Sequence, residues 1–236
     1  MNFGEFSDWI RSHVHSYEAG DHDALARALA PFAQTGASCG LLSSMLADTR
    51  WLDDILRTSY RHPNGFDKIV LLSAPGYQAR LHIWRTPDGL HQDVENIHNH
   101  RWDFSTLLLL GGYRYREFTL AEGGEAFHAY CYDSVRGTPS YSLEPLGHRL
   151  LSCCYDAHLG AGSSYTMTTG AFHRVIGDPG RLTATLLVQG RHRATSVLVF
   201  AEQPRPIGAA LPLSRFSRAS LTYDLETLLG RLKATG

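Results

Sequence analysis

Nine short segments with the composition of β-strands follow one another after residue 65. They are rich in β-branched and aromatic residues, and Gly, Pro and Asp separate them. Because no helical pattern intervenes, they predict an antiparallel sandwich or barrel rather than a parallel sheet with crossover helices. The predicted strands cover residues 67–74, 77–86, 104–110, 113–120, 126–134, 148–157, 164–169, 173–177 and 182–190.

Helical periodicity is confined to the two ends of the chain. Leu25 and Leu29 follow an N-cap at Asp21 or Asp23 with the spacing of one buried helical face. Similar spacing predicts two short helices between residues 39 and 60 and another helix at the C-terminus. We expect one domain over residues 1–236, made of a helical N-terminal extension (1–62), a β-barrel (66–200) and a C-terminal helix (215–236).

The charge balance and the hydropathy argue against two classes of partner. The chain has 22 basic and 23 acidic residues, so it lacks the positive excess that neutralises a nucleic-acid backbone. No apolar run reaches the roughly 18 residues that span a bilayer, and the N-terminus has no leader pattern. We expect a soluble cytoplasmic protein, a monomer or homodimer, that binds neither nucleic acid nor membrane.

The spacing of the four cysteines does not predict a disulfide framework or a metal site. They show no CxxC spacing, and two of them are adjacent, which suits neither a disulfide framework nor a zinc knuckle. We expect buried or half-buried thiols at Cys39, Cys131, Cys153 and Cys154.

Three histidines are the candidate metal ligands. His98 and His100 have the same parity, so on an extended strand both imidazoles point to one face and are close enough to share an ion. His173 enters another predicted strand after a turn at Gly170. Structural histidines that are satisfied by protein partners are the alternative interpretation.

The segments around these histidines resemble the two sequence motifs of the cupins, which are double-stranded β-helix (jelly-roll) proteins. His98, His100 and Gly112 fill the first motif, but its glutamate position falls on Phe104 or Ser105. The resemblance implies a mainly β cupin barrel with an N-terminal helical layer and a C-terminal helix.

The second motif is also matched in part. Gly162, Gly170 and His173 fall in place, while Thr168 replaces a proline and Gly177 replaces an asparagine. Two motifs in the right order, in a chain with this strand pattern, favour a metal site over structural histidines.

Cupins with three histidines and no glutamate include the thiol dioxygenases, of which cysteine dioxygenase is the best known. The chain resembles them in its N-terminal helical layer and in the order of "LHIW", "IHNH" and "FHRV". The resemblance implies a ferrous ion held by His98, His100 and His173, with open positions for substrate and dioxygen.

The chain also departs from cysteine dioxygenase. Ser105 stands where that enzyme has a cysteine that cross-links to a tyrosine, and the segment 182–190 lacks the histidine and tyrosine of its proton relay. Its carboxylate-binding arginine has no clear match, although Lys68 and Arg80 lie in that region. These departures argue against cysteine as the substrate and leave the iron site in place.

The ligand set itself constrains the chemistry. Three neutral imidazoles leave a divalent metal with its full double charge, which favours an anionic substrate as a direct ligand. Imidazole suits several metals, so iron is preferred through the resemblance alone, and Zn, Ni or Mn are alternatives.

Four other residues are candidates for catalytic roles. Arg80 and His82 share one face of a strand and would supply a cation and an acid or base if that face is internal, whereas a water-facing strand is the alternative. Asp103 would orient a ligand imidazole, or else lie in a solvated turn. Tyr165 would donate to bound oxygen, or else serve packing. Thr183, Thr185 and Gln189 are further candidates for substrate contacts.

The sequence thus predicts a mononuclear iron dioxygenase or oxidase whose partners are dioxygen and a small anionic, metal-coordinating molecule that resembles a thiol or amino acid. A non-redox cupin enzyme, such as an isomerase, decarboxylase or lyase, is one alternative. A cupin that only binds a small molecule is another, because the fold hosts many functions.

Overall fold

The computed structural model describes residues 1–62, 64–85, 95–134, 141–205 and 213–235. Its helices are α1 (Phe3–Glu18), α2 (Ala24–Leu29), the 3-10 helix η1 (Ala30–Ala33), α3 (Thr35–Ala47), α4 (Thr49–Thr58) and α5 (Arg218–Thr235). Its strands are β1 (Tyr60–His62), β2 (Phe66–Ala74), β3 (Tyr77–Trp84), β4 (Ile97–His98), β5 (Trp102–Leu110), β6 (Gly112–Ser134), β7 (Tyr141–Gly160), β8 (Ser164–Met167), β9 (Phe172–Gly177), β10 (Thr183–His192), β11 (Val197–Ala201) and β12 (Ser214–Arg215).

The strands form two antiparallel sheets. The larger has the order β12-β1-β2-β3-β10-β5-β8, and the smaller has the order β11-β4-β9-β6-β7. Strands β3 to β10 pair as one nested hairpin, because β3 pairs with β10, β4 with β9, β5 with β8 and β6 with β7. The paired arms cross together from one sheet to the other, which is the jelly-roll arrangement. The predicted fold class is confirmed: a mainly β, cupin-type double-stranded β-helix with an N-terminal helical layer and a C-terminal helix.

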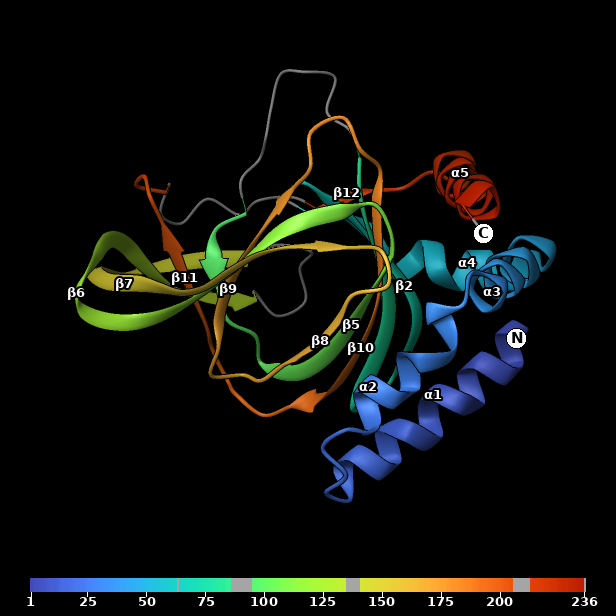
Figure 1. Cartoon of the computed structure of the whole chain (residues 1–236), viewed down its shortest axis with the longest axis horizontal. Coiled ribbons are helices and arrows are strands. Elements are labelled where there is room, and N and C mark those ends of the chain that lie inside the picture. The colour runs from blue at the N-terminus through green and yellow to red at the C-terminus, as the bar shows by residue number, and fades with distance from the viewer. Residues whose placement is uncertain (63, 86–94, 135–140, 206–212, 236) are drawn as a thin grey trace.

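Helices cover the outer face of the larger sheet. Figure 1 shows them gathered on one side of the barrel, while the β6–β7 hairpin projects from the other side. Leu81 and Ile83 of β3 pack with Ile10, Leu25 and Leu225 of the helices in one buried apolar cluster. Because Leu81 and Ile83 face the helices, the alternate residues of β3 face the smaller sheet and are shielded from water.

The inner face of β3 is polar and aromatic. Trp84 reaches across to Tyr113 of the smaller sheet, with 5.4 Å between ring centroids. Arg80 and His82 have the same parity as Trp84 and lie on this inner face. The water-facing alternative for this strand is thereby excluded.

A buried ion-pair network fastens α5 to the larger sheet. Arg85, just after β3, pairs with Asp67 of β2 at 2.6 Å and with Asp224 of α5. Both aspartates are buried and Arg85 is partly exposed, so the network joins the C-terminal helix to the barrel through two carboxylates that are shielded from water.

The structure corrects three expectations from the sequence. The predicted strands 113–120 and 126–134 are one strand, β6, because the pairing with β7 resumes at Glu125 after a bulge that follows Leu120. The expected helical range ends at Thr58, and Tyr60–His62 form β1. Cys153 and Cys154 are exposed on β7, because this strand lies at the edge of its sheet.

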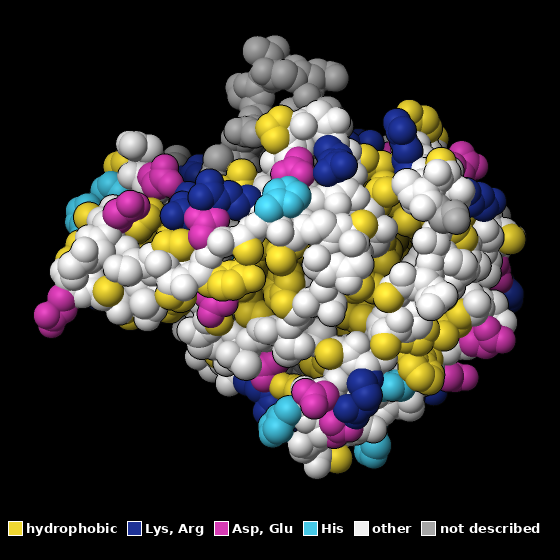
Figure 2. Space-filling view, in the orientation of Figure 1, with side chains coloured by type: hydrophobic (Ala, Val, Ile, Leu, Met, Phe, Trp, Pro, Cys, Tyr) yellow, Lys and Arg dark blue, Asp and Glu magenta, His cyan; other side chains and the backbone are white. Residues whose placement is uncertain are grey.

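The described surface is mixed in charge. On the face shown in Figure 2, Lys and Arg side chains are interspersed with Asp and Glu side chains. Among the described helices, none is both long enough and apolar enough to cross a membrane.

Candidate metal centre

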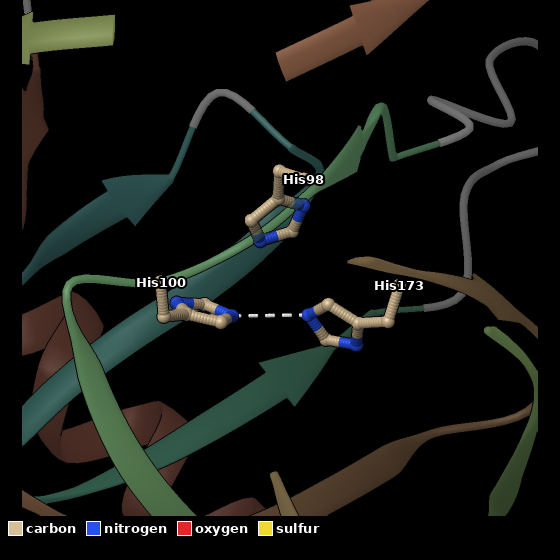
Figure 3. A group of neighbouring side chains, drawn as sticks. All are labelled: His98, His100 and His173. Carbon is tan, nitrogen blue, oxygen red and sulfur yellow. Dashed lines mark hydrogen bonds between the residues drawn. The ribbon is translucent and has the colours of Figure 1, made fainter. Parts of the chain in front are cut away.

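Three imidazole rings converge between the two sheets. His98, His100 and His173 point toward one another in Figure 3, and their ligand nitrogens all lie within 4.8 Å of one another. The closest pair is His100 Nε2 and His173 Nε2, at 3.0 Å. The ring of His100 also contacts Phe104 of the larger sheet at 4.9 Å, which places the cluster inside the barrel.

Strand pairing positions two of the three ligands. His98 of β4 lies directly opposite His173 of β9 in the ladder. His100 lies beyond the end of β4, so the argument from strand parity holds for His98 but not for its neighbour. His100 nevertheless points into the same cluster, which requires another constraint on the connection between β4 and β5.

Asn99 supplies that constraint. Its side chain accepts a hydrogen bond from the Leu198 backbone N–H at 2.7 Å and donates to the Thr169 carbonyl at 3.1 Å. Its own backbone N–H donates to the Leu198 carbonyl at 3.2 Å. The residue between the two histidines thus fixes the connection to β11 and to the turn before His173.

The geometry and protonation of the cluster fit a metal ion. The His100 and His173 nitrogens lie 3.0 Å apart, a separation that two imidazoles bound to one ion could adopt with bonds of about 2.1 Å. Burial lowers the pKa of His100 and the pKa of His173 well below the ordinary value of an imidazole, so both rings are neutral at pH 7. His98 Nδ1 lies 2.9 Å from the Asn96 carbonyl, which holds the tautomer whose Nε2 lone pair is free.

A buried carboxylate lies next to this cluster. Glu95 Oε1 is 3.8 Å from His98 Nε2, and Glu95 Oε2 accepts a hydrogen bond from the Val175 N–H at 2.8 Å. Burial raises the pKa of Glu95. Sequence reasoning missed this residue, because the cupin motif places its glutamate after the two histidines and Glu95 precedes them. A metal ion at this cluster would therefore meet three imidazoles, with one carboxylate nearby.

The predicted pocket residues Arg80 and His82 lie on the inner face beside the cluster. Arg80 is buried and donates to Gln189, and its guanidinium lies 5.2 Å from the centre of the Trp102 ring. Arg80 Nε, His82 Nε2 and Thr185 Oγ1 are buried without a partner among the described residues. Such atoms are costly to bury unless a ligand or water satisfies them, which makes this face a candidate substrate surface.

Asp103 is occupied elsewhere. It accepts hydrogen bonds from the Tyr17 hydroxyl and the Thr169 N–H, and Arg193 Nε lies 3.1 Å from it. These partners are not the ligand histidines, so the expected imidazole contact does not form in the described structure. Asp103 instead joins α1 to the turn that precedes β9.

Tyr165 is one step removed from the histidines. Its hydroxyl lies 3.1 Å from the Tyr113 hydroxyl, and its ring packs 4.6 Å from Tyr115. The ring of Tyr115 in turn lies 5.7 Å from the ring of His173. An aromatic layer thus separates the histidine cluster from Tyr165.

No family model and no curated protein matches the sequence. Among solved structures, a protein with a double-stranded β-helix domain from Klebsiella pneumoniae matches 64% of this chain and 95% of its own, at 13% identity and a TM-score of 0.34. Hydroxypropylphosphonic acid epoxidase from S. wedmorenis matches 56% of this chain and 53% of its own, at 14% identity and a TM-score of 0.32. The DMSP lyase DddQ from Ruegeria pomeroyi matches 60% of this chain and 56% of its own, at 14% identity and a TM-score of 0.34. This chain spans about half the length of the epoxidase and of the lyase. At such identities the likeness concerns the fold alone.

Proposed function

We propose that this chain is a mononuclear iron dioxygenase or oxidase that acts on a small anionic molecule, such as a thiol or an amino-acid-like compound. The observation that carries the proposal is the convergence of the His98, His100 and His173 nitrogens inside the barrel. Bound ferrous iron would supply the one-electron chemistry that reactions of dioxygen require. The partners of the protein are then dioxygen and the substrate, and the substrate binds in the same barrel.

The chain's own residues divide the remaining work. The three histidines hold the metal in a neutral ligand set, and Glu95 brings one negative charge close to it. Phe104 and Tyr115 pack against the imidazoles and exclude water from that side. Arg80 Nε has no hydrogen-bond partner among the described residues and could orient an anionic group of the substrate.

The resemblance to thiol dioxygenases makes their chemistry the first to test. Ser105 Oγ lies 2.7 Å from Thr166 Oγ1, so the position of the missing cysteine is filled by a hydroxyl pair. A protein–tyrosine thioether is not possible at that position, and we propose turnover without one. This difference favours a thiol or amino-acid-like substrate other than cysteine.

Oxygen uptake tests the proposal. Iron-loaded protein is mixed with cysteine, cysteamine or mercaptopropionate in an oxygen electrode, next to zinc-loaded protein and the variants His173→Ala and His15→Ala. His15 is exposed on α1 and serves as the matched control. We expect oxygen uptake with the iron-loaded protein and none with the zinc-loaded protein. The uptake should be lost in His173→Ala and kept in His15→Ala. Substrate conversion by the zinc-loaded protein without oxygen uptake would replace the proposal with Lewis-acid chemistry.

A further inference from the structure

Two cationic side chains lie on the inner face of the larger sheet. In the β2–β3 ladder Lys68 lies opposite His82, and Val70 lies opposite Arg80. Lys68 and Arg80 are therefore diagonal neighbours on one face, at a spacing that long side chains can bridge. Arg80 is buried, and Lys68 is partly buried.

The described partners of these cations are electrically neutral. Lys68 Nζ donates to the Tyr60 hydroxyl at 3.1 Å and lies 5.0 Å from the centre of that ring. Arg80 donates to the Gln189 side chain and lies over Trp102. Within the described residues, neither cation forms an ion pair with a carboxylate.

This arrangement is unfavourable unless an anion joins it. Cations are rarely buried without a counter-charge, because the energy lost on leaving water is not recovered. Burial, together with the charge of Arg80, lowers the pKa of Lys68 well below its ordinary value, and burial lowers the pKa of Arg80 to about 10. An anion between the two side chains would relieve both effects.

The cations lie close to the histidine cluster. The Trp102 ring contacts Arg80 on one side, and its centroid lies 5.7 Å from that of His100. His82 and Thr185, which are opposite each other in the β3–β10 ladder, add to the same inner face two polar atoms that have no partner in the described part of the chain. Polar groups thus continue from the cations toward the histidines.

We propose that Lys68 and Arg80 together bind a doubly charged oxyanion of the substrate, such as a phosphate, a phosphonate or a pair of carboxylates. The inference rests on the proposed function, since another donor atom of the same molecule would reach the metal held by the histidines. Two cations that pair with no acid among the described side chains match two negative charges, whereas a single carboxylate leaves one cation unpaired.

Binding of simple anions to the full-length, metal-free protein tests the inference. Methylphosphonate and succinate are the doubly charged probes, and acetate at equal ionic strength is the singly charged control. Isothermal titration should show that at least one doubly charged probe binds about tenfold or more tightly than acetate. The variants Lys68→Met and Arg80→Met should each lose about the same factor, and Lys233→Met, which removes an exposed lysine, should lose none.

A second readout does not depend on any variant folding. Lys68 and Lys233 are the two lysines of the chain, so mass spectrometry can follow acylation of each in the wild-type protein. The bound probe should slow acylation of Lys68 and leave Lys233 unchanged. Equal binding of acetate and both doubly charged probes, or no protection of Lys68, would overturn the inference. Because these measurements need neither metal nor oxygen, failure of the anion site is distinguishable from failure of the proposed function.

Discussion

His98 and His173 are register partners in the β4–β9 ladder, although they are far apart in the sequence. The nested pairing of strands β3 to β10 creates this relationship, because each strand of the first arm meets its counterpart in the second arm. The cluster of three histidines thus forms only when the barrel closes correctly. A metal that binds there should in turn stabilise the closed barrel.

Metal binding should raise the free energy of unfolding. A ligand that binds only the folded state stabilises it by about 2.7 kcal/mol at one hundred times its Kd. We expect the free energy of unfolding in urea to rise by about this amount when ferrous or zinc ion is added to the metal-free protein at that excess. EDTA should reverse the increase. An equal shift in His98→Ala would show that the ion acts at another site.

Glu95→Gln should weaken metal binding and leave the fold intact. The amide keeps an acceptor for the Val175 N–H but removes the negative charge that lies 3.8 Å from His98 Nε2. We expect metal affinity to fall by about 10–100-fold, the usual cost of losing a group that supports a metal ligand. Competition with a chromogenic chelator measures this affinity. Glu202→Gln, which changes an exposed carboxylate that pairs with Arg174, is the control. Equal affinities in the two variants would contradict a role for Glu95.

Arg85→Met should destabilise the protein more than the loss of a surface ion pair does. It leaves Asp67 and Asp224 without their shared cation in a buried position. We expect a loss of about 3 kcal/mol, the lower end of the range for a broken buried pair, because 42% of the Arg85 side chain is exposed. Arg218→Met breaks the exposed pair with Asp53 and should cost no more than about 1 kcal/mol. Chemical unfolding compares the two, and similar losses would argue against the anchoring role of Arg85.

Tyr17→Phe should change the response of the protein to alkaline pH. Burial and the hydrogen bond to Asp103 raise the pKa of Tyr17 to about 12. In the unfolded chain this phenol ionises near pH 10. Its contribution to stability is therefore fully present below about pH 10 and is lost as the pH rises through about 12.

Urea unfolding at several pH values tests this linkage. We expect the wild type to be more stable than Tyr17→Phe by about 1–2 kcal/mol up to about pH 10, because the variant removes a partner of a buried carboxylate. The difference should then shrink as the pH approaches 12. A difference that stays constant from pH 9 to 12 would contradict the raised pKa of Tyr17.

The fold could be predicted from the sequence largely because the local patterns are strong. Alternation in β3 and β10 and helical spacing around Leu25 and Leu225 each mark an element with one core-facing side. The continuity of β6 could not be predicted, since its bulge looks like a turn in the sequence and only pairing with β7 shows otherwise. Strand β4 is two residues long and has no periodicity to detect.

The site was only partly visible in the sequence. His98, His100 and His173 stand at recognisable spacings, so the motifs find them. Glu95 lies only three residues before His98, but the cupin motif places its glutamate after the histidines and so does not mark it. Lys68 belongs to no motif, because its significance comes from Arg80 on the neighbouring strand. For the same reason the partners of Asp103, which lie in α1 and before β9, could not be anticipated.

The metal content of the purified protein tests the central claim most directly. Protein made without a histidine tag and without added metal is analysed by inductively coupled plasma mass spectrometry, together with His98→Ala, His100→Ala, His173→Ala and the control His15→Ala. The three-histidine centre predicts about one metal ion per chain in the wild type and the control, iron if the oxygenase proposal holds, and a large loss in each of the other three variants. A folded wild type without metal, or metal content unchanged in all three variants, would contradict it.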